Sequence, residues 1–235
     1  DICPSRGLGD VYKRQAYGEF VSEESLNNIT FEDVIDFYNS YFKPNNTYIV
    51  VVGDVNFKDI KKIIKKRFGN WEVSNTLEKT IPTAKANVSN TEINFVDMPN
   101  AVQSNISLTS NVEFSMSDDD YHAVLIANKI LGGGFNSYLN MNLREEHGYT
   151  YGARSSIGAS RYRVSRFTAS TAVRNMVTDS AVIEIVKEIN KIRDTFVDEE
   201  KLKNAKAKYV GDFVLALERP STIAGYALDV IYNNL

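Results

Sequence analysis

The sequence predicts an α+β protein built from two consecutive pieces. Each piece combines short β-branched runs with amphipathic helical patterns. A polar, aperiodic stretch at residues 76–90 separates them, as is typical of a linker. With 235 residues and 43% hydrophobic content, the chain has enough apolar mass for two small cores. We therefore expect pieces at residues 16–75 and 91–235, with antiparallel-rich sheets covered by helices.

Residues 1–15 show no apolar periodicity, and we exclude them from the fold. The run from Ser5 to Gln15 is similar to the translation of a transposase adaptor used in sequencing libraries, which indicates a non-native segment. A basic N-terminal arm is the alternative. If the segment is non-native, the native sequence begins near Ala16 and upstream motifs are missing. The compartment of the protein is therefore unknown.

The first piece contains patterns for two helices and one strand. Thr30 opens a capping-box-like helix start, and Lys43-Pro44 ends that helix. The β-branched run Tyr48–Val52 ends at a glycine and predicts a buried strand. Residues 57–68 place isoleucine and phenylalanine on one face and lysines around them, which predicts a basic-faced surface helix.

The second piece opens with two predicted strands, Glu92–Asp97 and Val102–Leu108. Acidic residues before position 121 favour a helix start, and a glycine run ends that helix. Leucines point inward from a short helix expected at residues 136–147, and Gly148 suits a left-handed position after it. The remaining elements are predicted from periodicity: strands at about 149–157 and 163–173, and helices at about 179–195, 198–217 and from 221 onward.

Composition excludes several classes of function. The 27 basic and 30 acidic residues give a net charge of −3, which argues against a nucleic-acid groove. The apolar runs are far shorter than the roughly 20 residues of a membrane-spanning helix. Cys3 alone cannot form a thiolate cluster, and His122 and His147 are too far apart for a short zinc motif. No metal site is predicted in this chain.

One segment carries a family resemblance. The stretch Leu131–Gly152, LGGGFNSYLNMNLREEHGYTYG, resembles the second-domain signature of the insulinase and pitrilysin-type zinc peptidases, the inverzincins. It is most similar to the shorter bacterial members related to mitochondrial processing peptidase. Upstream, Tyr41–Asn46 and Val50–Val55 resemble the end of the metal-bearing first domain of that family. The resemblance covers nearly all of residues 16–235 and implies two homologous halves in a clam-shell, truncated here at both ends.

The resemblance also implies how the two halves divide the chemistry. An H-x-x-E-H helix and a later glutamate hold Zn²⁺ in the first half, upstream of Ala16, so Zn²⁺ is expected only in the full-length protein. The second half contributes Arg144, which binds a substrate carbonyl or carboxylate, and Tyr151, which donates a proton to the developing oxyanion. The helix end and the Gly148 turn between them are compatible with both side chains facing one cavity. The alternative is that Arg144 forms an ordinary surface pair and Tyr151 packs on a strand.

Four further residues are candidates for substrate binding. Gly133, Gly134 and Phe135 belong to the signature, although a glycine run after a helix also fits a simple helix end. Tyr149 is expected two residues before Tyr151 on the same strand face, which makes it the rival for the hydroxyl role.

We therefore expect a fragment of a zinc endopeptidase that hydrolyses peptides or unfolded polypeptides in an interdomain chamber. The fragment would supply the half that binds substrate and assists the transition state, and would be inactive without its zinc-bearing partner segment. The alternative is a non-catalytic partner or core-type subunit of the same fold, which binds substrate or assembles a complex beside a homologous zinc-bearing chain. No nucleic-acid partner and no membrane span are expected.

Overall fold

The computed structural model describes residues 21–73, 86–161 and 164–235. The chain divides into two compact units, residues 1–84 and 85–235. The segment at 1–15 that we expect to be non-native lies outside the described residues, and so does most of the linker expected at 76–90. The domain limits drawn from the sequence stay predictions.

Residues 21–73, the described part of the first unit, form three helices, α2 (Glu23–Asn27), α3 (Phe31–Tyr41) and α4 (Phe57–Phe68), with a 3-10 turn at Pro44–Asn46. The start of α3 confirms the capping box: the Asp33 amide donates to Thr30 Oγ1 at 3.2 Å, and the Thr30 amide donates to Asp33 Oδ2 at 2.8 Å. Two backbone donors that the helix leaves unpaired are satisfied in this way.

Two predicted strands are wrong. Residues 48–52 and 92–97 form no strand, and their apolar side chains are exposed, up to 87% for Ile93 and 82% for Phe95. A β-strand needs a neighbour to accept and donate its backbone hydrogen bonds. The described residues offer none to either run, so β-branched composition alone was not sufficient. Val50–Val52 therefore lies in no sheet, contrary to the expected separate sheets for the two pieces.

The second unit is built on a three-stranded antiparallel sheet in the order β1-β3-β2. The strands are β1 (Gln103–Glu113), β2 (Ala153–Ile157) and β3 (Val164–Arg174). Ser107 and Arg154 both lie opposite Ser170, on the two sides of β3. This sheet and its helices confirm the α+β class. β1 is longer than predicted, and β2 starts at Ala153 instead of near residue 149.

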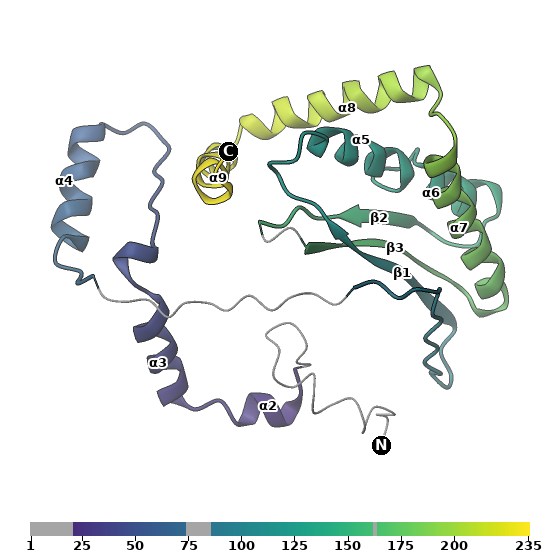
Figure 1. Cartoon of the computed structure of the whole chain (residues 1–235), viewed down its shortest axis with the longest axis horizontal. Coiled ribbons are helices and arrows are strands. Elements are labelled where there is room, and N and C mark those ends of the chain that lie inside the picture. The colour runs from purple at the N-terminus through teal and green to yellow at the C-terminus, as the bar shows by residue number, and fades with distance from the viewer. Residues whose placement is uncertain (1–20, 74–85, 162–163) are drawn as a thin grey trace. The chain divides into compact units, whose positions relative to one another are not determined.

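Helices cover one face of this sheet (Figure 1). Three of these helices, α5, α6 and α7, contribute buried side chains to the core that they form with the strands. The bounds are α5 (Tyr121–Leu131), α6 (Tyr138–Asn140), a π-helix η2 (Met141–Glu146), a 3-10 turn η3 (Asn175–Val177), α7 (Thr178–Asp194), α8 (Glu199–Leu217) and α9 (Pro220–Asn233).

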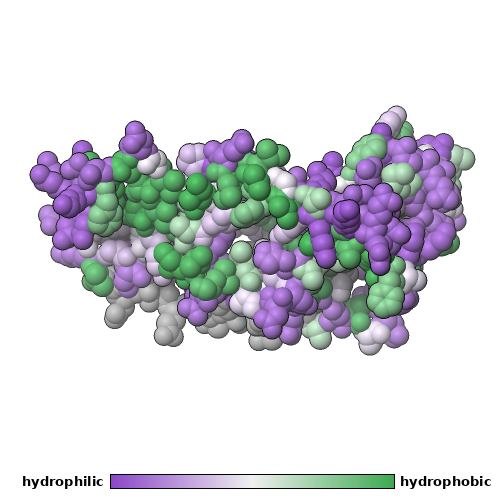
Figure 2. Space-filling model, turned by 90° about the horizontal axis from the view of Figure 1, so that it is seen from above, coloured by the Kyte–Doolittle hydropathy of each residue, from purple (hydrophilic) through white to green (hydrophobic). Residues whose placement is uncertain are grey.

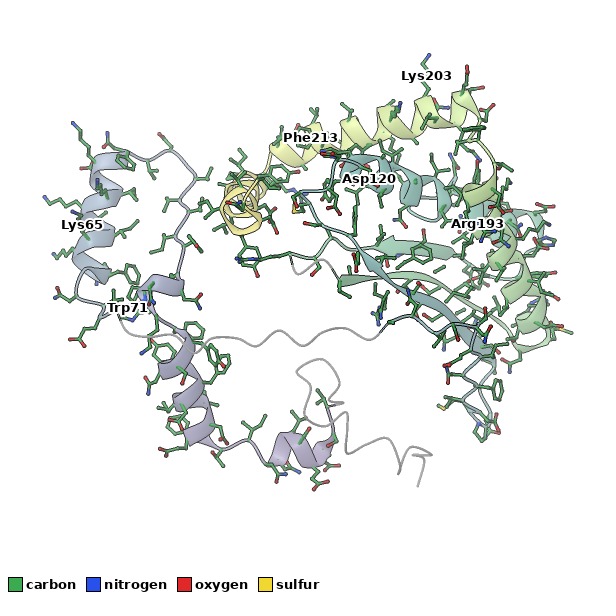
Figure 3. The ribbon with its side chains drawn as sticks, viewed as in Figure 1. Lys65, Trp71, Asp120, Arg193, Lys203 and Phe213 are labelled. Atoms are coloured by element: carbon green, nitrogen blue, oxygen red, sulfur yellow. The ribbon has the colours of Figure 1, made fainter. Side chains whose placement is uncertain are left out.

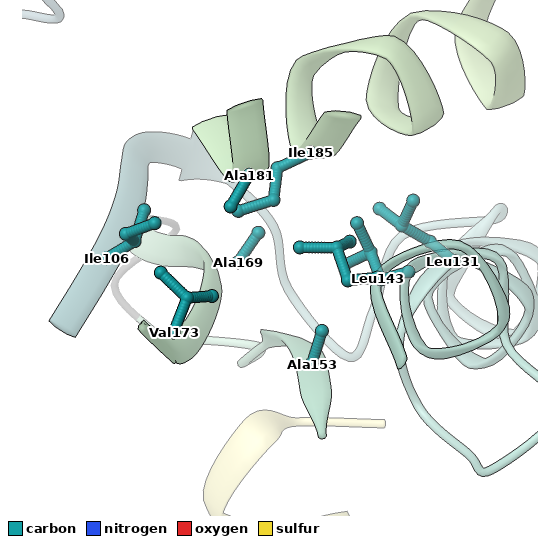
Figure 4. Close-up of a cluster of buried hydrophobic side chains, with 9 residues drawn as sticks. Ile106, Leu131, Leu143, Ala153, Ala169, Val173, Ala181 and Ile185 are labelled. Carbon is teal, nitrogen blue, oxygen red and sulfur yellow. The ribbon is translucent and has the colours of Figure 1, made fainter. Parts of the chain in front are cut away.

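The core lies between the sheet and these helices (Figure 4). Ala169 and Val173 of β3 are buried, and alternate residues of the same strand are exposed, as the period of two in a strand requires. Leu143 and Ile185 fill the space from the helix side with 0% and 1% exposure. Each such side chain contributes about 2 kcal/mol of hydrophobic stabilisation. This core holds the segment around Leu143 firmly.

Apolar side chains remain exposed on the last two helices. Phe213, Leu215, Val230 and Ile231 are each between 48% and 64% exposed. The second half of α8 and α9 contribute to the hydrophobic areas of Figure 2, and Figure 3 labels Phe213 on α8. Within the described ranges, no helix has the length and apolar content needed to cross a bilayer.

Candidate functional site

Arg144 lies on a π-helix. The sequence predicts an ordinary helix at 136–147, but after α6 the backbone widens over Met141–Glu146. The His147 amide donates to the Asn142 carbonyl at 3.0 Å, five residues back, and the Tyr149 amide donates to the Leu143 carbonyl at 2.8 Å. π-helical turns are rare in proteins overall, and those that occur are often found at functional sites. Gly148 follows with a φ of 60°, so the expected left-handed position is confirmed.

The Arg144 side chain contacts two neighbouring side chains and remains partly exposed to solvent. Its Cζ lies 4.6 Å from the centre of the Phe135 ring, a cation–π arrangement. Its Nε lies 3.5 Å from Glu145 Oε1, which is the surface pair that the sequence left as an alternative. The side chain is still 35% exposed. A guanidinium that rests on one ring and remains partly exposed can donate hydrogen bonds to a carbonyl or carboxylate oxygen.

Tyr151 is almost fully exposed, at 93%. Its neighbours fix the backbone: Thr150 Oγ1 donates to the Gly152 carbonyl at 3.0 Å, and Thr171 Oγ1 donates to Thr150 Oγ1 at 2.9 Å. The alternative of a packed strand aromatic is therefore wrong for this residue. Within the described ranges, no hydrogen bond, ion pair or ring contact joins Tyr151 to Arg144, so their joint role stays a prediction.

Tyr149 has a different environment. Its ring stacks on His147 with centroids 4.9 Å apart, and it packs against the core. The expectation that Tyr149 and Tyr151 share a strand face is wrong, because β2 begins only at Ala153. Tyr149 is half-buried and Tyr151 is exposed, so Tyr151 is the more accessible of the two side chains.

The three glycines of the run at residues 132–134 differ in the space around them. At two of them a side chain would clash with neighbouring atoms, and at the third it would not. A Cβ on Gly132 would lie 2.2 Å from the Ser155 amide nitrogen, and one on Gly133 would lie 2.7 Å from Lys129 Cα. A Cβ on Gly134 would have no atom within 4 Å. Phe135, the next residue, is 60% exposed. Packing thus explains the first two glycines, and the substrate contacts expected for Gly133, Gly134, Phe135 and Tyr149 stay predictions.

Asn140, a buried asparagine that sequence reasoning missed, organises this segment. Its Nδ2 donates to the Phe135 carbonyl at 2.8 Å, and its Oδ1 accepts from the Ala153 amide at 3.3 Å. One side chain thereby ties the Phe135 loop to the start of β2. In the sequence, Asn140 directly follows the inward-facing Leu139. Helical periodicity alone places such a polar residue on the surface, so nothing in the sequence indicated that Asn140 is buried.

Asn142, a second buried asparagine, ties the π-helix to α7. Its Nδ2 donates at 2.8 Å to Glu184 Oε2 and at 2.8 Å to Glu188 Oε1. The hydrogen bond from Asn142 is the largest cause that lowers the pKa of Glu184, and the one from Lys187 is the next. Glu188 is buried and also pairs with Lys191 at 3.3 Å. The backbone that carries Arg144 is therefore fixed from two sides.

The histidines do not form a zinc site. His122 Nδ1 lies 3.0 Å from the Tyr209 hydroxyl, and His147 stacks on Tyr149 with Nε2 3.9 Å from Glu184 Oε2. Within residues 21–73, 86–161 and 164–235, no three His, Cys, Asp or Glu side chains come together as ligands. The described donor set does not fit Zn²⁺.

The profile of the peptidase M16 inactive domain matches residues 28–209. The chain belongs to the peptidase M16 family. This family is the insulinase type, so the resemblance read from the glycine run and the Arg144–Tyr151 segment is confirmed. The match spans the described helices of both units from α3 to most of α8, and includes the whole sheet.

The M16 chain is similar to two curated bacterial proteins and to solved structures. It is 26% identical over 217 residues to the zinc protease PqqE of Helicobacter pylori, covering 90% of this chain and 48% of that protein. It is 26% identical over 157 residues to the probable inactive metalloprotease YmfF of Bacillus subtilis, covering 65% of this chain and 35% of that protein. The chain thus spans less than half the length of these relatives.

The crystal structure of a peptidase M16 inactive domain from Pseudomonas fluorescens matches with a TM-score of 0.78 at 23% identity. The match covers 91% of this chain and 50% of that one. At this identity the match shows the fold alone, and it confirms that the helices and the antiparallel sheet have the M16 arrangement.

Proposed function

We propose that this M16 chain is a fragment of a zinc-dependent endopeptidase that hydrolyses peptides, and that it supplies the second half, which binds the peptide and assists the transition state. The observation that carries the proposal is the pair of presented donors: Arg144, supported by Phe135 yet 35% exposed, and Tyr151, 93% exposed. The name of the Helicobacter pylori relative, a zinc protease, favours hydrolysis. The zinc ligands would belong to sequence outside the residues described here.

The two donors suit two different tasks. A guanidinium has five N–H groups in a planar fork and binds a carbonyl or carboxylate of the substrate. A phenolic hydroxyl is a single donor that can stabilise a developing oxyanion, at a typical value of about 3 kcal/mol. In this proposal Arg144 positions the peptide and Tyr151 stabilises the negative charge. Neither side chain contacts the metal.

A second candidate is a non-catalytic partner subunit of the same fold. The Bacillus subtilis relative is named a probable inactive metalloprotease, and the matched profile is that of an inactive domain. Such a subunit would bind substrate or assemble with a homologous zinc-bearing chain. The upstream gene sequence distinguishes the candidates: an H-x-x-E-H motif with a later glutamate supports the enzyme, and its loss supports the partner.

The kinetic test uses the full-length, zinc-bearing protein. Tyr151→Phe removes one hydroxyl and should lower kcat for peptide cleavage by about 10²- to 10³-fold. Tyr149→Phe is the matched control and should be milder, because that ring is stacked and half-buried. Arg144→Lys keeps the charge but loses the fork, so KM should rise more than kcat falls. Zinc content and Tm are measured for each variant.

Two outcomes would contradict the catalytic proposal. Unchanged turnover in Tyr151→Phe would show that the exposed hydroxyl does not act in the reaction. An equal loss in Tyr149→Phe would show that either hydroxyl change acts through the local structure.

A further inference from the structure

The face of the sheet that the helices leave uncovered has an unusual composition. It consists of every second residue of each strand, opposite the buried set. Serine, threonine, asparagine and glutamine occupy most positions, and all the basic residues are arginines. These polar-face residues are Gln103, Asn105, Ser107, Thr109, Asn111 and Glu113 of β1, Arg154 and Ser156 of β2, and Val164, Arg166, Thr168, Ser170, Ala172 and Arg174 of β3.

The arginines of the polar face have no acidic partner among the residues that the structure describes. Arg154, Arg166 and Arg174 are exposed, and within the described ranges no carboxylate lies at ion-pair distance from any of them. Glu113, at the end of β1, is the one acidic residue on these strand positions. The whole chain has 30 acidic and 27 basic residues, so this local excess of positive charge runs against the overall balance. Solvated surfaces usually mix the two signs.

The three arginines are regularly spaced. Arg174 lies opposite Gln103, Arg166 lies opposite Asn111, and Arg154 lies opposite Ser170, midway between them along β3. Four residues of an extended strand span about 13 Å, so the positive charges recur at about that interval. An extended polypeptide aligned with the strands would meet one of them about every fourth residue.

A shallow hollow of about 390 Å³ lies on the same face. Asn105, Ser107, Arg154 and Ser170 line it, so one guanidinium stands among side chains that donate and accept hydrogen bonds. Gly152 also lines the hollow and follows Tyr151 directly in the chain. The hollow therefore borders the segment that carries the presented hydroxyl.

We infer that the polar face binds the polypeptide substrate and selects extended segments that carry several acidic residues. The inference rests on the proposed function and adds a substrate class to it. The guanidinium groups of Arg154, Arg166 and Arg174 bind carboxylates of the peptide, and the serine and asparagine side chains of the hollow bind its backbone. The occupant is a peptide and not a nucleic acid, because none of the strand positions of the polar face carries an aromatic side chain on which bases could stack.

The test measures binding of fluorescent twelve-residue peptides to the full chain by anisotropy. One peptide carries three aspartates at four-residue spacing in a Gly/Ser background, and its partner carries asparagines instead. We expect the acidic peptide to bind at least tenfold more tightly at low salt, and that preference to shrink as salt is raised. The variant Arg154→Gln/Arg166→Gln/Arg174→Gln should lose about tenfold in affinity for the acidic peptide alone.

The matched control removes three charges from another basic surface. Lys62→Gln/Lys65→Gln/Lys66→Gln changes exposed lysines of α4, where Lys65 is labelled in Figure 3, and should keep the full preference. An arginine variant that keeps the preference, or a lysine variant that loses it equally, would overturn the inference. So would a single-stranded oligonucleotide that binds as tightly as the acidic peptide, since the face would then be a general polyanion surface.

The remaining outcomes separate this inference from the proposed function. Equal affinity for the acidic and the neutral peptide would overturn the selection of acidic segments and leave peptide binding by this half intact. Failure of every peptide to bind the parent chain would overturn peptide binding itself, and the inference with it.

Discussion

The buried amide of Asn142 offers the sharpest test of how the π-helix is held. Asn142→Leu keeps a similar volume but removes both 2.8 Å hydrogen bonds to Glu184 and Glu188. Hydrogen bonds to charged groups are worth about 1.5–3 kcal/mol each. Two features reduce the loss: Glu188 retains Lys191 at 3.3 Å, and Asn142 Oδ1, buried without a partner in the described structure, is removed as well. We therefore expect about 2–3 kcal/mol of destabilisation.

Thermal and urea unfolding of the purified chain measure this loss. For a unit of about 150 residues, 1 kcal/mol shifts Tm by about 2–4 °C, so the Tm of the second unit should fall by about 4–12 °C. Asn204→Leu on the exposed face of α8 is the control and should change Tm little. A difference between the two variants below about 0.5 kcal/mol would refute the view that Asn142 holds the π-helix to α7.

Three further predictions concern the same unit and the metal. Gly132→Ala should lower the free energy of unfolding by about 1–3 kcal/mol, because the added Cβ would lie 2.2 Å from the Ser155 amide nitrogen. Gly134→Ala should be nearly neutral, because no atom lies within 4 Å of its Cβ. Equal effects of the two variants in urea unfolding would contradict this. The pKa of Glu184 is lowered in the folded state, so its contribution to stability is complete above the ordinary pKa of a glutamate and is lost as pH falls through its pKa in the folded protein. Glu184→Gln should therefore reduce the loss of stability at acidic pH, as measured by unfolding at a series of pH values. Purified chain should hold no stoichiometric zinc, and one Zn²⁺ that survives dialysis against a weak chelator would contradict the ligand assignment.

The helices could be predicted because their signals are local. Thr30 and Asp33 form the expected capping box, and the apolar periodicity of 57–68 gave the bounds of α4. Gly148 was also predictable, because a residue in the left-handed region after a helix is usually glycine. In each case the residues that determine the structure lie within one or two turns of each other.

The strands and the buried amides could not be predicted in the same way. Residues 48–52 have strand composition but no described neighbour to pair with, and pairing depends on distant segments. The π-helix and the partners of Asn140 and Asn142 also depend on contacts up to 46 residues away. Arg144 and Tyr151 were found through the family signature. Their environments, one supported by Phe135 and one exposed, came only from the structure.

The π-helix at Met141–Glu146 makes the number of residues in this segment as important as their identity. Leu139 and Leu143 fix one end in the core, and Ala153 fixes the other end in the sheet through Asn140. Removing a single residue would convert the wide turn to α geometry and rotate Arg144 by about 100° relative to one anchor. An alignment of relatives with this architecture should therefore tolerate substitutions between these anchors and contain no gap there.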